Sequence, residues 1–396
     1  MSRSTTAGFA VLAMATSAAL IGISPSVATP SATAVAHADR RVCATPAPGF
    51  AACDAHVVTD VRTAQPLATT TYSNGYRPDQ LTSAYGPFGS GKQLVAIVDA
   101  YAHPSAAADL QVYRDTFGLG TAALTQVNQN GGSITTVSGN TGWGQEEMLD
   151  LEMVSAICPS CSILYVGANS ASFSDLSAAV TLAKNMGAKV ISNSYGAKEF
   201  STESGISAWN IPGVAVTVSS GDSGYGVQFP AASAGVIAVG GTTLNLSSSG
   251  ARQSETAWSG AGSGCSAYIA KPSWQKDPAC SRRTVADVSA VADPNTGVAV
   301  YDSYGSTGGA NWYVFGGTSV AAPIIGAIYA RDGVPGTGYA TATLYATPSG
   351  LFDVTSGSNG RCTRGRNTSG AYLCTAGTGY DGPTGLGAPS TSTAPF

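Results

Sequence analysis

The run Leu94-Val95-Ala96-Ile97-Val98, which ends in Asp99, indicates the fold of this 396-residue chain. It is continuously apolar, as expected for a strand buried on both faces of a parallel sheet. Four similar runs follow, at residues 163–166, 190–194, 214–218 and 236–239. Helical patterns at 104–117 and 174–186 lie between them. This alternation predicts an α/β fold with a largely parallel central sheet flanked by helices.

The N-terminus has the pattern of a secretory signal. Arg3 precedes an apolar segment at 7–23, and Ala36-His37-Ala38 is a small-x-small cleavage site. An uncleaved membrane anchor fits less well, because the segment is short and rich in Ala, Ser and Thr. We therefore expect a signal peptide over 1–38 and a secreted, extracellular protein without membrane attachment afterwards. Residues 39–72 are then predicted as an extended arm, and 73–396 as a single domain.

Composition narrows the possible partners. Charged residues make up 11% of the chain, the formal net charge is −4, and there is no Lys/Arg run, so nucleic acid is not an expected partner. The eight cysteines fall as neighbours, Cys43/Cys53, Cys158/Cys161, Cys265/Cys280 and Cys362/Cys374. An even number in an exported chain favours disulfides, and we predict these four local pairs. A redox or metal role for the Cys158/Cys161 pair is the alternative.

A Gly-rich loop brings Ser319 to the start of an apolar helical segment, in Gly317-Thr318-Ser319. Free N–H groups at a helix start favour negative charge nearby. This stretch alone fits either a helix cap or a serine nucleophile.

A nucleophilic serine needs a base, and histidine is a poor candidate here. His37 leaves with the signal, His56 lies in the arm, and His103 is not in a His-Gly-Thr setting. A Ser-His-Asp triad is therefore disfavoured.

Three acidic residues offer a substitute. Glu146 and Asp150 are four apart in a helical segment at 144–154, so they share one face. If buried together they would share a proton; the alternative is a solvated acidic face. Asp222 follows the predicted strand at 214–218, at a strand end where ligand chemistry is common. Protonated, it would donate a hydrogen bond to an oxyanion; an Asx turn is the alternative.

Taken in order, these motifs resemble the sedolisin family of serine-carboxyl peptidases. They are Glu146-x-x-x-Asp150, Gly221-Asp222-Ser223-Gly224 and Gly317-Thr318-Ser319-x-x-x-Pro323. The resemblance extends over residues 73–390 and implies a subtilisin-like fold and a secreted endopeptidase that hydrolyses proteins or peptides at acidic pH. It also implies that Ser319 is the nucleophile, Glu146 the general base, Asp150 its orienting partner and Asp222 the oxyanion stabiliser.

The resemblance further implies one structural Ca²⁺ near the C-terminus. The implied ligands are Asp353, Val354, Gly377, Gly379 and Asp381, with Val354 and the glycines binding through their carbonyl oxygens. Such an all-oxygen set suits Ca²⁺. Without the resemblance, the Gly-rich segment would be interpreted as a plain loop.

Some features depart from the family or stay open. Family members carry a large folded propeptide, whereas only about 35 residues separate Ala38 from the predicted domain. Asp99 lies at the end of a predicted strand and is interpreted as structural, with an additional acid near the cleft as the alternative. A secreted binding protein that has lost catalysis is the main alternative; an esterase is disfavoured, because the Gly-x-Ser-x-Gly elbow is absent.

We expect a monomer that acts on protein or peptide substrates, bound as a strand beside Ser194-Tyr195-Gly196.

Overall fold

The computed structural model describes residues 1–2, 4, 37–87, 89–306, 308–309, 311–362, 370–391 and 396. Most of the predicted signal, including Arg3, the apolar segment 7–23 and Ala36, lies outside the described residues. The chain from His37 to Phe396 forms one compact unit. The arm predicted at residues 39–72 is therefore packed within the same unit as the rest of the chain.

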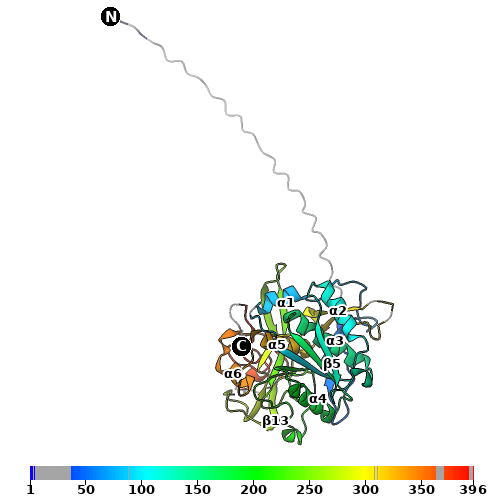
Figure 1. Ribbon diagram of the computed structural model, residues 1–396. Coiled ribbons are helices and arrows are strands. Elements are labelled where there is room, and N and C mark those ends of the chain that lie inside the picture. Colours follow the sequence, from blue (N-terminus) through cyan, green and yellow to red (C-terminus); the bar gives the residue numbers. More distant parts are fainter. Residues whose placement is uncertain are drawn as a thin grey trace. The chain divides into compact units, whose positions relative to one another are not determined.

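The central sheet has the predicted parallel architecture (Figure 1). Its strand order is β12-β11-β9-β7-β4-β6-β5, and β15 also pairs with β11. All of these pairs are parallel except β11 with β12. The strands are β4 (Leu94–Ala100), β5 (Ala123–Asn128), β6 (Ser162–Ala168), β7 (Val190–Asn193), β9 (Ala215–Ser219), β11 (Ile237–Leu246), β12 (Arg252–Ala257) and β15 (Val288–Val291).

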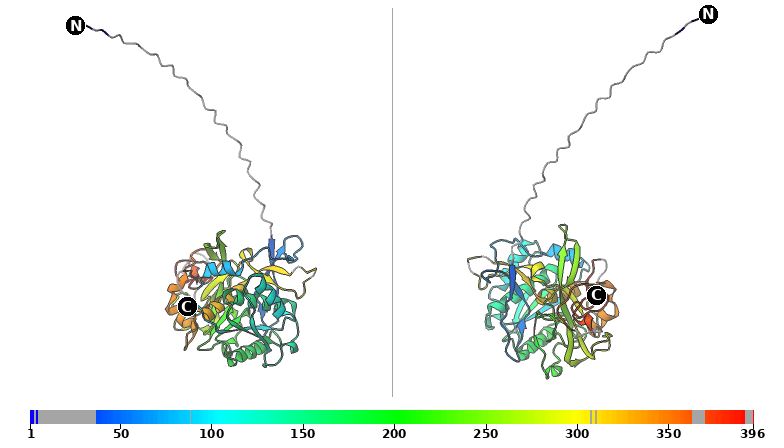
Figure 2. Two further views of the ribbon diagram at one scale, coloured as in Figure 1. Left: turned by 45° about the horizontal axis from the view of Figure 1, so that its top comes forward. Right: turned by 180° about the vertical axis from the view of Figure 1, so that it is seen from behind.

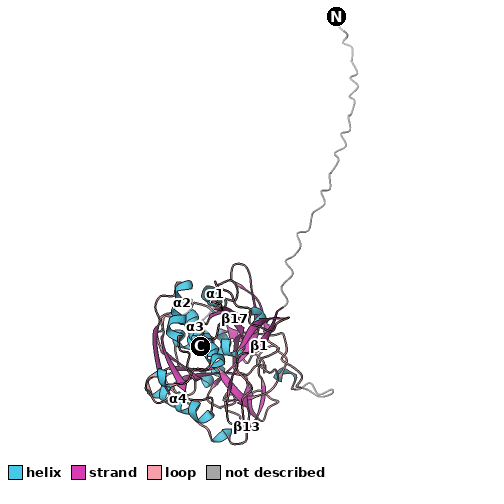
Figure 3. Ribbon diagram, turned by 90° about the vertical axis from the view of Figure 1, so that its right-hand side faces the viewer, coloured by secondary structure: helices cyan, strands magenta, loops and turns pink. Residues whose placement is uncertain are grey.

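Helices cover both faces of this sheet (Figure 3). Val95 and Ile97 of β4 lie in the apolar cluster that contains α3 and α5, whereas Ala96 and Val98 lie in the cluster that contains α4. Both faces of the strand are buried, which confirms the interpretation of its unbroken apolar sequence. The helices are α1 (Pro78–Tyr85), α2 (Ala106–Thr116), α3 (Thr141–Ile157), α4 (Phe173–Asn185), α5 (Thr318–Asp332) and α6 (Ala340–Ala346), with short 3-10 turns at Ile134–Thr136, Glu203–Gly205, Pro294–Thr296, Pro348–Gly350 and Ala371–Leu373. Within the described part of the chain, no helix is long and apolar enough to span a bilayer.

The N-terminal arm is built into two smaller sheets, which the sequence analysis did not predict. One has the order β1-β3-β17-β16 and the other β10-β8-β2. Figure 2 shows these first strands in blue against the side of the molecule. Their bounds are β1 (His37–Arg41), β2 (Ala52–Cys53), β3 (His56–Asp60), β8 (Tyr195–Lys198), β10 (Gln228–Phe229), β16 (Val298–Tyr301) and β17 (Trp312–Gly316); two hairpins pair β13 (Gly264–Ala270) with β14 (Arg282–Val285) and β18 (Leu351–Phe352) with β19 (Ala388–Pro389).

Four disulfides join the cysteines in the predicted local pairs. They are Cys43–Cys53, Cys158–Cys161, Cys265–Cys280 and Cys362–Cys374. Each closes a short loop, so each restricts the unfolded chain only locally.

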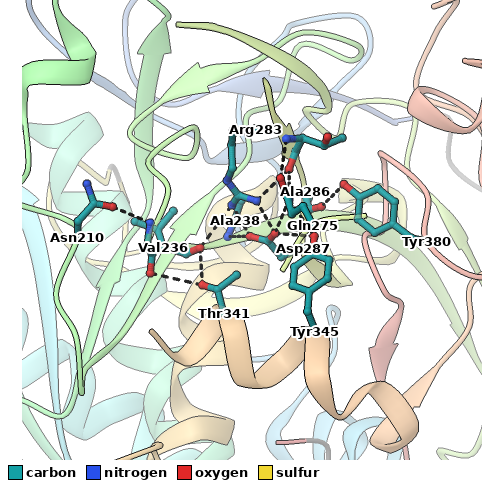
Figure 4. Close-up of polar contacts among 12 residues, drawn as sticks. Asn210, Val236, Ala238, Gln275, Arg283, Ala286, Asp287, Thr341, Tyr345 and Tyr380 are labelled. Carbon is teal, nitrogen blue, oxygen red and sulfur yellow. Dashed lines mark hydrogen bonds and ion pairs between the residues drawn. The ribbon is translucent and has the colours of Figure 1, made fainter. Parts of the chain in front are cut away.

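A buried ion pair connects the sheet to the C-terminal part of the chain (Figure 4). The Arg283 guanidinium forms a bidentate pair with Asp287, at 2.6 and 2.5 Å. The Asp287 carboxylate also accepts the Ala238 N–H of β11 (2.7 Å) and the Tyr345 hydroxyl of α6 (2.9 Å). Both oxygens of this buried carboxylate accept hydrogen bonds, and these bonds together with the attraction to Arg283 offset part of the desolvation cost of the pair.

Replacing Asp287 with Asn should strongly destabilise the protein. The change keeps the shape of the side chain but leaves the buried Arg283 charge without its counter-charge, which costs about 3–5 kcal/mol. Tyr345→Phe removes only one neutral donor from the same carboxylate and should cost about 1 kcal/mol. Denaturant unfolding of both variants measures the difference; equal losses would contradict the importance of the charge pair.

Candidate active site

Ser319 lies buried at the N-terminus of α5, as the sequence predicts. The preceding Gly317 has φ +99°, and a side chain there would collide with the Asp54 carbonyl oxygen. Thr318 donates both its backbone N–H and its hydroxyl to Asp222 Oδ1, at 2.8 Å each. The loop thus fixes Ser319 beside Asp222 at a helix terminus that favours negative charge.

Glu146 and Asp150 lie on α3, and the prediction of a shared helix face is correct. The alternative of a solvated acidic face is wrong, because Glu146, Glu147, Asp150 and Glu152 are all fully buried. Burial, followed by the charges of Asp150 and Asp99, raises the pKa of Glu146 well above its usual value. Burial and the Asp99 charge likewise raise the pKa of Asp150.

Ser194, which follows β7, connects this acidic pair to Ser319. Its hydroxyl donates to both Asp150 oxygens at 2.8 Å, and its carbonyl oxygen accepts the Ser319 hydroxyl at 3.2 Å. Neither oxygen of Glu146 has a hydrogen-bond partner among the described residues, although the nearby Ser319 hydroxyl lowers the pKa of this group. A rotation of the Ser319 hydroxyl from Ser194 to Glu146 would satisfy that buried carboxyl.

Asp99 belongs to the same electrostatic cluster, so the structure favours the alternative of an additional acid near the cleft over a purely structural role. Burial raises its pKa to about 8, and both of its oxygens lack a hydrogen-bond partner among the described residues. The structure makes β9, β7 and β4 neighbours in the sheet. Asp99, Ser194 and Asp222 all lie at the carboxyl ends of these strands, where parallel sheets place their ligand chemistry.

Asp222 presents one free oxygen toward the same loop. Oδ1 is occupied by Thr318, whereas Oδ2 has no hydrogen-bond partner among the described residues and lies against Gly317. Burial raises the pKa of Asp222, although His56 and Thr318 oppose the shift. A proton on Oδ2 would make this oxygen a donor, while Oδ1 keeps its acceptor role.

The two histidines that follow the predicted signal occupy different surroundings. His103 Nδ1 accepts the Ser105 N–H, and Nε2 faces Asp302 at 2.8 Å and Asp109 at 3.4 Å. These three side chains could group around a metal ion, but their polar atoms already bond one another. Since both ring nitrogens are engaged, His103 is not free to act as a base.

His56 lies beside the candidate site, which its position in the arm did not suggest. Its Nε2 is 3.6 Å from Asp222 Oδ2, and its Nδ1 is 2.5 Å from Asp39 Oδ1. Burial lowers the pKa of His56, but the bond to Asp39 and the charge of Asp222 outweigh burial and raise it overall.

The five predicted calcium ligands lie in two C-terminal segments that approach each other. Asp353 Oδ2 accepts the Gly379 N–H (2.9 Å), while Asp353 Oδ1 is buried without a hydrogen-bond partner among the described residues. Asp381 accepts the Gly377 N–H (3.1 Å) and the N–H and hydroxyl of Thr384. An unpartnered buried carboxylate oxygen beside turning backbone is a feature that a bound cation would satisfy.

Three comparisons with known proteins agree with this geometry. Residues 118–332, more than half of the chain, match the model of the subtilase family. Kumamolisin from Bacillus sp. (strain MN-32) is 33% identical over 360 residues, which cover 79% of this chain and 62% of kumamolisin. Sedolisin from Pseudomonas sp. (strain 101) is 38% identical over 208 residues, covering 44% of this chain and 33% of that protein. The chain thus spans less than two thirds of the length of either curated relative.

A solved structure shows the same fold. It is Pseudomonas sedolisin, a serine-carboxyl proteinase complexed with two molecules of pseudo-iodotyrostatin. The TM-score is 0.68 at 28% identity, and the match covers 81% of this chain and 97% of that one. The chain therefore belongs to the subtilase family, and within it is similar to kumamolisin and sedolisin.

Proposed function

We propose that this protein is a secreted serine endopeptidase that hydrolyses proteins or peptides at acidic pH. The observation that carries the proposal is the link through Ser194, which joins the Ser319 hydroxyl to a buried carboxyl pair on α3. The similarity to kumamolisin and sedolisin supports the same chemistry. Four disulfides and the signal-like N-terminus support an extracellular setting.

In the proposed reaction, Ser319 Oγ attacks the carbonyl carbon of a peptide bond, and Glu146 takes the hydroxyl proton. Asp150 is the second carboxyl group of the buried pair, and its role is to orient Glu146. The oxyanion would lie between the Ser319 N–H and protonated Asp222 Oδ2. Glu146 then returns the proton to the leaving amine, and water releases the acyl group from Ser319.

The carboxyl groups favour low pH for two separate reasons. Asp222 must carry a proton to donate to the oxyanion, and its buried position raises its pKa. Asp99, Glu146 and Asp150 repel one another when ionised, so the cluster retains protons at acidic pH while leaving a carboxylate to act as base. These two requirements predict a rate of peptide hydrolysis that rises and then falls as pH increases.

Ser319→Ala should abolish hydrolysis of a denatured protein at acidic pH, lowering kcat/KM by about 10⁴-fold or more. The reason is that the acyl-enzyme needs Ser319 Oγ. Ser160→Ala, at an exposed serine between α3 and β6, is the matched control and should keep full activity. A wild-type protein without activity over the whole acidic range would favour the binding-protein alternative.

The free energy of unfolding should fall as pH rises from about 4 to about 8. Asp99 ionises near its ordinary pKa in the unfolded chain, about 3.9, but at about 8 when folded. Its contribution is therefore fully present below pH 4 and is lost as pH rises through the folded value. Asp99→Asn should reduce this pH dependence, whereas exposed Asp115→Asn should not.

Denaturant unfolding at several pH values, with all variants carrying Ser319→Ala to prevent self-digestion, measures this dependence. An unchanged slope in Asp99→Asn would contradict the role given to burial of Asp99.

We also propose one structural Ca²⁺ held by Asp353 and Asp381 and by the carbonyl oxygens of Val354, Gly377 and Gly379. Two observations support this site. Asp353 Oδ1 has no hydrogen-bond partner among the described residues, and the Asp353 and Asp381 carboxylates are close enough to repel each other, a repulsion that a divalent cation would neutralise. The ion would tie the segment after β18 to the loop at 377–381.

Chelation should lower the melting temperature of the Ser319→Ala protein by about 5 °C, because a bound ion stabilises only the folded state. Asp353→Asn should already melt lower and respond little to chelator, whereas Asp115→Asn should respond as the parent does. Differential scanning calorimetry with and without EGTA tests this; a parent protein that melts at one temperature in both conditions contradicts the site.

A further inference from the structure

Two contacts of the candidate site depend on one short stretch of backbone. β7 ends at Asn193 and β8 begins at Tyr195, so Ser194 is the single residue between the two strands. Its carbonyl oxygen accepts the Ser319 hydroxyl at 3.2 Å, and its own hydroxyl donates to both Asp150 oxygens at 2.8 Å. The orientation of this one residue therefore sets the contacts of both the serine and the carboxyl pair.

The Asn193 side chain is the centre of a buried hydrogen-bond network at the end of β7. Asn193 is fully buried, and its Oδ1 accepts the Tyr195 hydroxyl at 2.8 Å and the Trp209 Nε1–H at 3.0 Å. Its Nδ2 donates to the carbonyl oxygens of Ile191 and Thr217, both at 3.1 Å. Both amide hydrogens and both lone pairs of the amide oxygen are thus used.

The partners of this amide determine its orientation. The indole N–H of Trp209 can only donate, so the Asn193 oxygen must face it. The two backbone carbonyls can only accept, so the Asn193 nitrogen must face them. A flipped amide would lose these bonds. A fully satisfied buried amide rigidifies the segment that carries it.

The network holds the backbone on both sides of Ser194. Alternate side chains of an extended chain share a face, and the hydrogen bond from Tyr195 to Asn193 joins the two side chains that flank Ser194. We call this contact the Asn193–Tyr195 bridge. The Asn193 bond to Thr217 attaches the bridge to β9, the neighbouring strand of the central sheet. Ser194 is the middle residue of the bridge, and its own side chain faces Asp150 on α3.

We propose that Asn193 is a positioning residue for peptide hydrolysis: it fixes Ser194, and Ser194 in turn aligns Ser319 and Asp150. The proposal rests on the proposed peptidase function. Asn193 takes no part in proton transfer, because its amide neither gains nor loses a proton. Its effect is on geometry, and a displacement of about 1 Å at a reacting group can lower a rate about 100-fold.

Loss of the Asn193–Tyr195 bridge should also change the acidity of the carboxyl pair. Burial and the Asp99 charge raise the pKa of Asp150, whereas the Ser194 hydroxyl lowers it. If Ser194 turns away, the pKa of Asp150 rises. The pair then loses its proton only at a higher pH, so Glu146 becomes available as a base at a higher pH. The other titratable groups that interact with Asp150 are Glu146, Tyr165 and Tyr195.

The first test is Asn193→Leu, which nearly keeps the size of the side chain and removes all four hydrogen bonds. We expect kcat for an internally quenched peptide to fall by about 10-fold to 100-fold, with KM nearly unchanged because the backbone edge of β8 remains. The rising limb of the plot of rate against pH should move to higher pH. Asn193→Asp keeps the acceptor oxygen and, when protonated, one donor, so it should restore most of the activity at acidic pH.

Tyr195→Phe tests the same bridge with a smaller disturbance, including the case in which Asn193→Leu does not fold. It removes one hydroxyl that donates to Asn193, and should lower kcat by about 3-fold to 10-fold with the same direction of pH shift. Tyr345→Phe is the matched control, because it removes a hydroxyl that donates to buried Asp287. It should change neither kcat nor the rising limb. Melting temperatures in the Ser319→Ala background show which variants are folded.

A double-mutant cycle tests whether Asn193 acts through Ser194. In the Ser194→Ala background, Asn193→Leu should shift the rising limb no further, because the hydroxyl that bonds Asp150 is already gone. A further shift of equal size would overturn the proposal. Wild-type kcat and an unshifted rising limb in folded Asn193→Leu or in Tyr195→Phe would also overturn it, and would leave the peptidase function standing. Wild-type protein that hydrolyses no peptide at any acidic pH would remove the peptidase function, and this proposal with it.

Discussion

The burial of four carboxyl groups on a single helix is the constraint on which the rest of the structure depends. Glu146, Glu147, Asp150 and Glu152 all lie on α3 and are fully buried. Three of them accept a hydrogen bond from a different element: Glu147 from the His103 N–H, Asp150 from the Ser194 hydroxyl and Glu152 from the Tyr301 N–H. Because an unpaired buried carboxyl is costly, these three hydrogen bonds favour the observed rotation of α3 about its axis. In that rotation the fourth carboxyl group, that of Glu146, remains available to accept a hydrogen bond from the Ser319 hydroxyl.

Much of the fold could be predicted because its signals are local. Unbroken apolar runs such as 94–98 predicted the central strands. The loop and helix around Ser319 lie where the Gly317-Thr318-Ser319 motif predicts them. The four disulfides were also predictable, since each joins cysteines that are close in sequence. Strands in the arm were not predicted, because β1, β2 and β3 are short, and β2 and β3 also pair with the distant strands β8 and β17.

The candidate site was predictable in its residue types but not in its surroundings. The spacing of Glu146 and Asp150 showed that they share a face, yet only tertiary packing decides whether that face is buried. Asp99 and Ser194 join the site through the order of strands in the sheet, which no local pattern encodes. His56 approaches Asp222 only because β3 pairs with β17, and these strands are far apart in sequence.

The ion pair of Figure 4 has a consequence for the C-terminal loop that carries the proposed calcium ligands. Tyr380, between Gly379 and Asp381, donates its hydroxyl to the Ala286 carbonyl oxygen at 2.8 Å, next to Asp287. Asp287 in turn holds the Ala238 N–H of β11 in the central sheet. The loop and the sheet therefore share one continuous polar network, so their contributions to stability are coupled rather than independent. Damage at one end of this network weakens the other end, and the two losses do not simply add.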